Sequence, residues 1–296
     1  MSPDSLNDYF LHPNLSSINS NLPLALKCFV SSPSSLIFTT FSFTNVFLIV
    51  PLSIPIIFHG IQQKRTNSPT ATSHSDIFTY HMTILSLIGV FGCILCCLGI
   101  YSVHFNTVQA GFNLYAFTVY GEVFFQYLTC VERYLAVVHP ITYLSLRNER
   151  GIMIRNISIG CIWMLSLIVM GLMMIQELVI ILNFFLGLLS VTIICYLTFS
   201  VLYILIRPGP GEQGVNRERF DQSKLRAFYT MVAILGVLLL RFSWGIYWIS
   251  LFLSNEGASC TAMISGVWFN LPCTLVLPVL FLYKAGKFVF FKNEIQ

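Results

Sequence analysis

Charge is scarce in this sequence: Asp, Glu, Lys and Arg together make up 9% of its 296 residues. A soluble domain usually carries about 25% charged residues, which keep its surface in contact with water. This composition therefore argues against a soluble enzyme, a nucleic-acid-binding protein and a disordered chain. Hydrophobic residues make up 56% of the sequence, and the mean hydropathy is +0.77.

Arrangements of residues typical of catalytic or metal-binding sites are also lacking. No paired acids or metal-ligating residues converge outside the apolar stretches, so the sequence predicts neither an enzyme nor a bound cofactor. Nine cysteines are present. Cys28 and Cys260 lie outside the apolar stretches, whereas the others lie within them, where cysteine is typical as a small packing residue.

Long apolar stretches dominate the chain. A bilayer core about 30 Å thick needs about 20 apolar residues in a helix. Glu177 is the only charged residue between positions 157 and 206, and a single helix over that range would be about 75 Å long, so we expect two helices that meet at Gln176-Glu177. The seven expected spans are residues 36–60, 78–103, 108–138, 152–175, 178–206, 225–254 and 261–283.

The basic residues predict the orientation of these spans, because cytoplasmic loops are enriched in lysine and arginine. Alternate loops and the C-terminal tail hold nearly all of the basic residues, whereas the opposite side holds only Lys27. We therefore expect an all-α membrane protein, a seven-transmembrane helix bundle with its N-terminus outside. Its parts would be an extracellular segment (1–35), the bundle (36–283) and a cytoplasmic tail (284–296).

The expected extracellular segment contains Asn14-Leu-Ser, which matches the acceptor sequence for N-glycosylation. A three-residue match also arises by chance, as Asn156-Ile-Ser does on the expected cytoplasmic side. Asn14 is therefore either a glycosylation site or an unmodified residue.

A charged motif stands near the end of the third expected span. Glu132-Arg133-Tyr134 is followed by His139-Pro140, and a proline ends a helix. An arginine at this place is by itself also typical of a side chain that reaches from a span to the membrane interface. The whole run resembles the Asp/Glu-Arg-Tyr signature of rhodopsin-like (class A) G-protein-coupled receptors.

Other residues extend this resemblance over all seven spans. Trp163 corresponds to the tryptophan of the family's fourth helix, Tyr196 to the tyrosine of the fifth and Pro278 to the proline of the seventh. The run from Phe288 to Lys292 is similar to the short amphipathic eighth helix of that family.

Several features of the family are missing, so the chain resembles a divergent member. Gly89 replaces the aspartate of the second helix, and Val108 replaces the cysteine of the third, which removes the usual disulfide. Arg241-Phe-Ser-Trp replaces the hinge of the sixth helix. Leu277 and Phe281 replace the asparagine and tyrosine of the seventh helix.

The resemblance implies a receptor in the plasma membrane, among membrane lipids, that couples an extracellular ligand to a heterotrimeric G protein. Glu132 would hold Arg133 in the resting state, and Tyr196 would hold it in the active state. Two alternatives stay open: a receptor-like protein that does not signal, such as a decoy or an assembly partner, and a seven-span transporter. The coupling residues implied by the resemblance are Glu132, Arg133, Tyr134, Tyr196 and Pro278.

The resemblance also narrows the ligand. Retinal needs a lysine within the seventh span, whereas Lys284 lies beyond its end, and receptors for biogenic amines carry an aspartate where this chain has Tyr115. Aromatic residues at the outer span ends form either a pocket for a lipid or other apolar ligand or a belt at the membrane interface. These residues are Phe112, Tyr115, Tyr247, Trp248, Trp268 and Phe269.

Two pairings complete the predictions. Similarity to some peptide and nucleotide receptors implies a disulfide between Cys28 and Cys260, with two free thiols as the alternative. Glu122 and Arg241 each lie inside an apolar span, where a lone charge costs about 2.5–3.5 kcal/mol. Because the family's third and sixth helices face each other at this depth, we expect an ion pair. The alternative is a protonated Glu122 and an Arg241 that reaches the interface alone.

Overall fold

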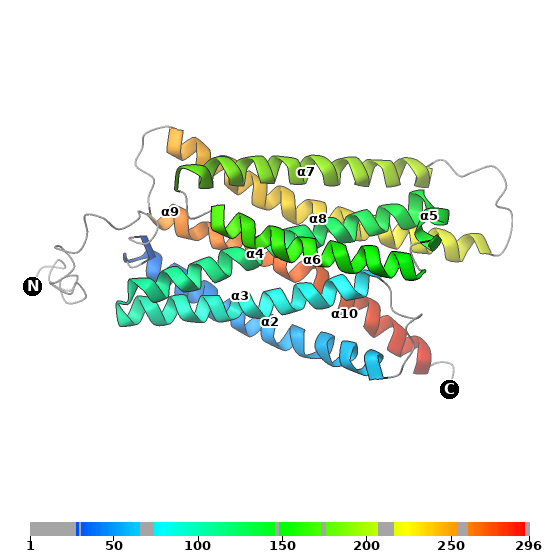
Figure 1. The fold of residues 1–296 in the computed structure, drawn as a ribbon, viewed down its shortest axis with the longest axis horizontal. Helices are drawn as coiled ribbons and strands as arrows, with labels where there is room; N and C mark the ends of the chain where they lie inside the picture. The colour runs from blue at the N-terminus through cyan, green and yellow to red at the C-terminus, as the bar shows by residue number, and fades with distance from the viewer. Residues whose placement is uncertain are drawn as a thin grey trace, which may run out of the picture.

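The computed structural model describes residues 28–29, 31–65, 74–145, 148–172, 176–206, 216–253 and 260–293, and nearly all of them are helical. Asn14 lies outside the described residues. The helices are α2 (Ser34–Arg65), α3 (His74–Ser102), α4 (Phe105–Val138), α5 (Pro140–Ser145), α6 (Glu149–Leu172), α7 (Gln176–Ile206), α8 (Asn216–Leu253), α9 (Cys260–Ser265), η3 (Gly266–Asn270) and α10 (Leu271–Asn293) (Figure 1).

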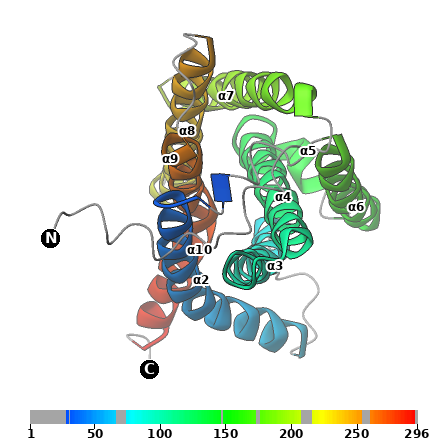
Figure 2. The same cartoon turned by 90° about the vertical axis from the view of Figure 1, so that its left-hand side faces the viewer.

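The long helices lie along one axis and form a bundle (Figure 1). One end, here called the disulfide end, carries Cys28, Cys260 and the turn between α3 and α4, and Figure 2 views the bundle from this end. The opposite end, called the motif end, carries Arg133 and α5. Helix α4 lies inside the bundle and contacts α3, α6, α7, α8 and α10.

Within the described residues, six helical segments are long and apolar enough to cross a membrane, which indicates a multi-pass membrane protein. They lie in α2, α3, α6, α7, α8 and the continuous segment Cys260–Tyr283. Large apolar side chains also point away from the bundle: Phe43 is 73% and Phe47 is 78% exposed on α2. Such surfaces suit a lipid solvent, because water-exposed apolar patches of this kind are rare in soluble monomers.

Helix α4, the third expected span, is not among these six segments. It carries Glu122, Gln126 and Glu132, all of them buried. These polar residues lower its hydropathy, but the neighbouring helices supply partners that lipid cannot offer. The composition of α4 therefore reflects its central place in the bundle.

The structure confirms two separate helices between residues 149 and 206. Helix α6 ends at Leu172 and α7 begins at Gln176, so Gln176 and Glu177, where the turn was predicted, are the first residues of α7. The expected separate eighth helix is wrong, because α10 runs without a break from Leu271 to Asn293. The residues before Phe288 contain no serine, threonine, aspartate or asparagine that would cap the start of a new helix.

Helices α3 and α4 approach each other so closely that their backbones touch. A Cβ on Gly111 of α4 would lie 2.6 Å from the backbone nitrogen of Cys96 on α3. A Cβ on Gly99 would lie 2.6 Å from the backbone nitrogen of Val108. Glycine permits this approach, as small residues do between membrane helices generally. Val108, where the family has its disulfide cysteine, is thus held by backbone packing.

This packing predicts that Gly111→Ala lowers the stability of the protein, because the added methyl group overlaps backbone atoms that cannot move aside. Overpacking of this kind costs about 1–3 kcal/mol. The measurement is the melting temperature of the purified chain in detergent micelles. Gly160→Ala is the matched control, since a Cβ on Gly160 would meet no atom within 4 Å. Equal melting temperatures for the two variants would contradict the packing argument.

Candidate functional site

A cavity of about 550 Å³ lies between α4, α7, α8 and the α9–η3 segment. Cavities that bind small molecules usually have volumes of about 300–1,000 Å³ and mostly apolar walls. Along α4 the cavity extends from Phe112 to Val131, about 28 Å at 1.5 Å per residue, so it is elongated. Its walls are mainly aliphatic and aromatic, and among the described residues Arg241 is the only charged one that lines it.

Only some of the predicted pocket residues reach this cavity. Phe112 and Tyr115 line it. Trp268 instead packs edge-on against Phe41, with ring centroids 5.6 Å apart. Phe269 stacks at 4.6 Å on Trp244, which itself lines the cavity.

Of the remaining two predicted residues, the structure describes the side chain of Tyr247 alone, and it does not line the cavity. Tyr247 is 48% exposed, in keeping with the interface belt that was the alternative interpretation. The side chain of Trp248 lies outside the described part of the chain.

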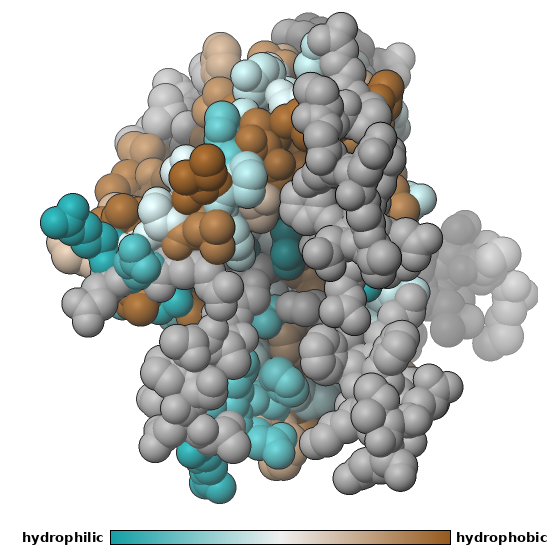
Figure 3. Space-filling model, turned by 90° about the vertical axis from the view of Figure 1, so that its right-hand side faces the viewer, coloured by the Kyte–Doolittle hydropathy of each residue, from teal (hydrophilic) through white to brown (hydrophobic). Residues whose placement is uncertain are grey.

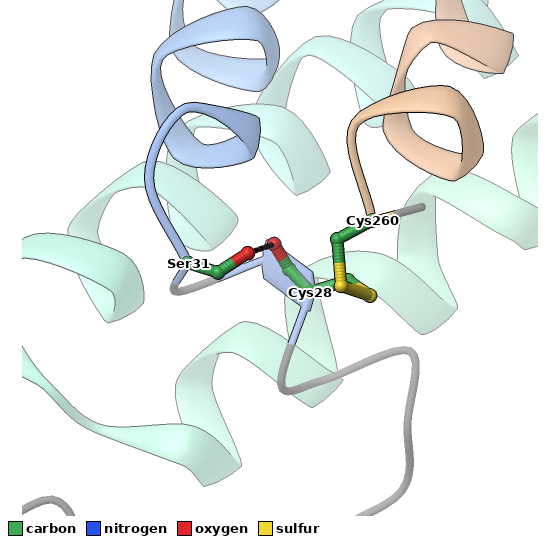
Figure 4. The surroundings of a disulfide bond; sticks show 3 residues. All are labelled: Cys28, Ser31 and Cys260. Atoms are coloured by element: carbon green, nitrogen blue, oxygen red, sulfur yellow. Dashed lines mark hydrogen bonds between the residues drawn. A yellow bond between two sulfur atoms is a disulfide. The ribbon is translucent and has the colours of Figure 1, made fainter. Parts of the chain in front are cut away.

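The segment that precedes α2 contributes one residue to the cavity wall at the disulfide end. Cys28 is bonded to Cys260, which confirms the predicted pairing, and the Ser31 hydroxyl donates a hydrogen bond of 3.0 Å to the Cys28 carbonyl (Figure 4). The next residue, Phe29, is 1% exposed and lines the cavity. Its ring lies 5.4 Å from that of Phe112. The disulfide therefore holds Phe29, an aromatic residue of the cavity wall, in place.

Among the lining residues that the sequence interpretation missed, Trp244 and Asn270 left a signal and Phe29 did not. Trp244 lies one helical turn after Arg241, so the two share a face of α8. Asn270 is a polar residue in an apolar span, a position that usually has a function. Phe29 left no signal, because its position depends on the disulfide at the preceding residue.

Glu122 holds three helices together but does not form the predicted ion pair. One carboxylate oxygen accepts a 2.8 Å hydrogen bond from Ser86 of α3, and the other accepts a 2.7 Å bond from Thr274 of α10. The Arg241 guanidinium instead lies 5.9 Å from the ring centroid of Tyr120. Tyr120 and Glu122 are two residues apart, about 200° around α4, so they face different neighbours. Helix geometry therefore separates Glu122 from Arg241, and the direct pair is wrong for this structure.

Glu122 belongs to a polar seam, defined as the contacts of Tyr115, Glu122 and Gln126 of α4 with η3 and α10. Asn270 donates a 3.3 Å hydrogen bond to the Tyr115 hydroxyl. Gln126, which is fully buried, donates a 2.6 Å bond to the carbonyl of Cys273. Positions 115, 122 and 126 lie on one face of α4, because their spacing is close to whole helical turns. The seam gives hydrogen-bond partners to the Tyr115 hydroxyl, one Glu122 oxygen and the Gln126 amide nitrogen, groups that would otherwise be costly to bury.

The predicted coupling motif lies at the end of α4 opposite the disulfide. Glu132 is buried and accepts a 3.3 Å hydrogen bond from the Tyr143 hydroxyl of α5. Arg133 is half-buried. The Tyr134 ring packs against His139, with centroids 5.8 Å apart. Val131 is the α4 residue of the cavity wall nearest the motif end, and Glu132 directly follows it. One helix therefore carries both the cavity wall and the motif.

Two other predicted coupling residues differ in their surroundings. Pro278 is buried within α10. Tyr196 is 66% exposed, and its predicted contact with Arg133 in the active state stays a prediction. The inward face of α7 carries Ile194, Leu197 and Val201, and residue 196 is out of phase with that face.

Basic side chains gather toward the motif end, which Figure 3 faces. Among the lysines and arginines whose side chains the structure describes, Arg241 alone lies in the half of the bundle nearer the disulfide. The others are Arg65, Arg133, Arg150, Arg155, Lys224 and Arg226. In the described residues no group of three or more His, Cys, Asp or Glu side chains is arranged to hold a metal ion.

Comparison with known proteins gives no relative: no protein-family model and no curated protein matches this chain. Its function must therefore be argued from its own residues and geometry.

The polar seam predicts that Thr274→Val destabilises the protein, because it leaves one buried oxygen of Glu122 without its hydroxyl partner. A buried group left unsatisfied costs about 1–3 kcal/mol. The measurement is the free energy of unfolding, or the melting temperature in detergent. Thr192→Val is the control, since the exposed Thr192 hydroxyl bonds only its own helix, at the Leu188 carbonyl. Similar losses for both variants would show that Glu122 does not depend on Thr274.

The disulfide predicts a second loss of stability. The double variant Cys28→Ser with Cys260→Ser should melt at a lower temperature than wild type, because the bond closes a loop of 232 residues and fixes Phe29 in the cavity. The chain-entropy model gives a cost of about 5.5 kcal/mol for so long a loop. Cys161→Ser, at an exposed free cysteine, should melt like wild type. Peptide mapping without reductant that finds both thiols free would contradict this prediction.

Proposed function

We propose that this protein is a seven-span receptor in the plasma membrane that couples an extracellular ligand to a heterotrimeric G protein. The observation that carries the proposal is the continuity along α4, where the cavity ends at Val131 and the coupling motif begins at Glu132. A ligand that fits the cavity better in one arrangement of α4, α7 and α8 than in another would shift the balance between the two arrangements. The motif end would then change its exposure to a G protein.

In this proposal α4 also crosses the membrane, third in chain order, and brings the number of spans from six to seven. Its 34 residues give a length of about 51 Å, more than a bilayer core requires. Its polar groups face other helices, which makes a central span acceptable in lipid. The clustering of basic residues at the motif end supports an orientation with that end in the cytoplasm and the disulfide outside.

A receptor-like protein that does not signal is the second candidate. The exposed position of Tyr196 favours it, as does the burial of Leu277 and Phe281 where the family has polar switch residues. Such a protein would keep the cavity but would not activate a G protein.

The effect of an Arg133→Ala substitution on G-protein activation distinguishes these two candidates. We expect wild type to raise G-protein activation above that of cells without the protein, and we expect Arg133→Ala to return it to background at equal surface expression. Arg150→Ala, which changes an exposed arginine at the same end, should signal like wild type. Guanine-nucleotide exchange in membranes is the measurement. Equal activity of wild type and Arg133→Ala would contradict the proposed coupling, and no activity from either would favour the second candidate.

A further inference from the structure

Arg241 places a permanent positive charge in the wall of an otherwise apolar cavity. Arginine stays protonated at any physiological pH. Its guanidinium lies over the Tyr120 ring, 5.9 Å from the centroid. Among the described side chains no carboxylate forms an ion pair with it. A charge inside a membrane span is expensive to maintain and usually marks the path or site of a ligand.

Glu122, the buried acid on α4 at this depth, does not form an ion pair with Arg241. Both oxygens of Glu122 accept hydrogen bonds from hydroxyl groups, those of Ser86 and Thr274. Glu122 does not line the cavity, whereas Arg241 and Tyr120 do. The planar fork of an arginine binds a carboxylate or a phosphate through two parallel hydrogen bonds. The guanidinium is therefore placed to receive an acidic group from a molecule that enters the cavity.

The remaining lining residues indicate the shape and polarity of the rest of that molecule. Tyr120, at the level of Arg241, lies 11 residues before Val131, so about 16 Å of cavity extends from Arg241 toward the motif end. Val123, Phe124 and Leu238 line this part of the cavity. A long, narrow, apolar space suits an extended chain better than a compact polar molecule.

We propose that the cavity binds a single-chain amphiphile with one acidic head group, and that Arg241 receives the head group while the chain lies toward Val131. This inference rests on the proposed function to the extent that the cavity is the receptor's ligand site. A cationic ligand is disfavoured, because Arg241 would repel it. The head group is a carboxylate or a phosphate, since the same fork binds both.

The test is a displacement assay on the full chain, purified and placed in nanodiscs of zwitterionic lipid. The probe is a fluorescent fatty acid, displaced by four competitors: palmitate, a single-chain lysophosphatidate, hexadecanol and hexadecylamine. We expect at least one of the two acids to displace the probe about tenfold better than the alcohol or the amine, about 1.4 kcal/mol. The better of the two acids identifies the head group.

Four variants locate the interaction. Arg241→Gln should remove the preference for acids and leave the alcohol's affinity unchanged, whereas Arg241→Lys should keep most of the preference. Arg226→Gln, at an exposed arginine of the same helix, is the control and should behave like wild type. Ala116→Trp, which fills the cavity, should weaken binding of acid and alcohol alike. Retained binding of Arg241→Lys or of the alcohol shows that the variants are folded.

The inference is overturned if wild type binds acid and alcohol equally, if Arg241→Gln keeps the preference, or if Ala116→Trp binds like wild type. Failure of the proposed function is a different result. Arg241-dependent binding without G-protein activation would sustain this inference and reject signalling, and Arg133-dependent activation without a preference for acids would do the reverse.

Discussion

The polar face of α4 can exist inside an apolar bundle only if other helices cover it. Glu122 and Gln126 would each be costly against lipid, and both are buried in contact with α3 or α10. This requirement fixes α4 at the centre, with α3 drawn against it at backbone distance and α10 joined to it by the polar seam. The side that faces α7 and α8 needs no such closure, and that is where the cavity lies.

The position of the cavity gives α4 two neighbours of different character. Toward α3 and α10 it makes close backbone contacts and hydrogen bonds, which resist displacement. Toward α7 and α8 it meets an elongated space with mostly apolar walls. A guest in that space would therefore press on α7 and α8 more readily than on α3. Movement of the outer helices around a fixed α4 is the mechanical consequence.

The sequence predicted the helices well, because each span needs only length and apolar composition. The division of residues 149–206 into two helices and the disulfide were likewise predicted correctly, although the predicted turn residues Gln176 and Glu177 belong to α7. Side-chain directions were harder, since a helix that is apolar all around gives little sign of which face turns inward. Tyr196 faces outward because Ile194 and Leu197 face inward. Glu122 turns away from Arg241 for a similar reason, the rotation of α4, which only the packed bundle determines.

The disulfide also sets an order of events in the making of the molecule. It joins residues 28 and 260, so it cannot form until residue 260 has been synthesised. Phe29, which lines the cavity at that end, is synthesised early, but the disulfide that anchors it can form only after Cys260 is made. Until then the cavity wall beside Phe112 lacks that tether. A chain interrupted before α9 would carry the motif and most of the cavity walls, yet it would lack the disulfide that anchors Phe29.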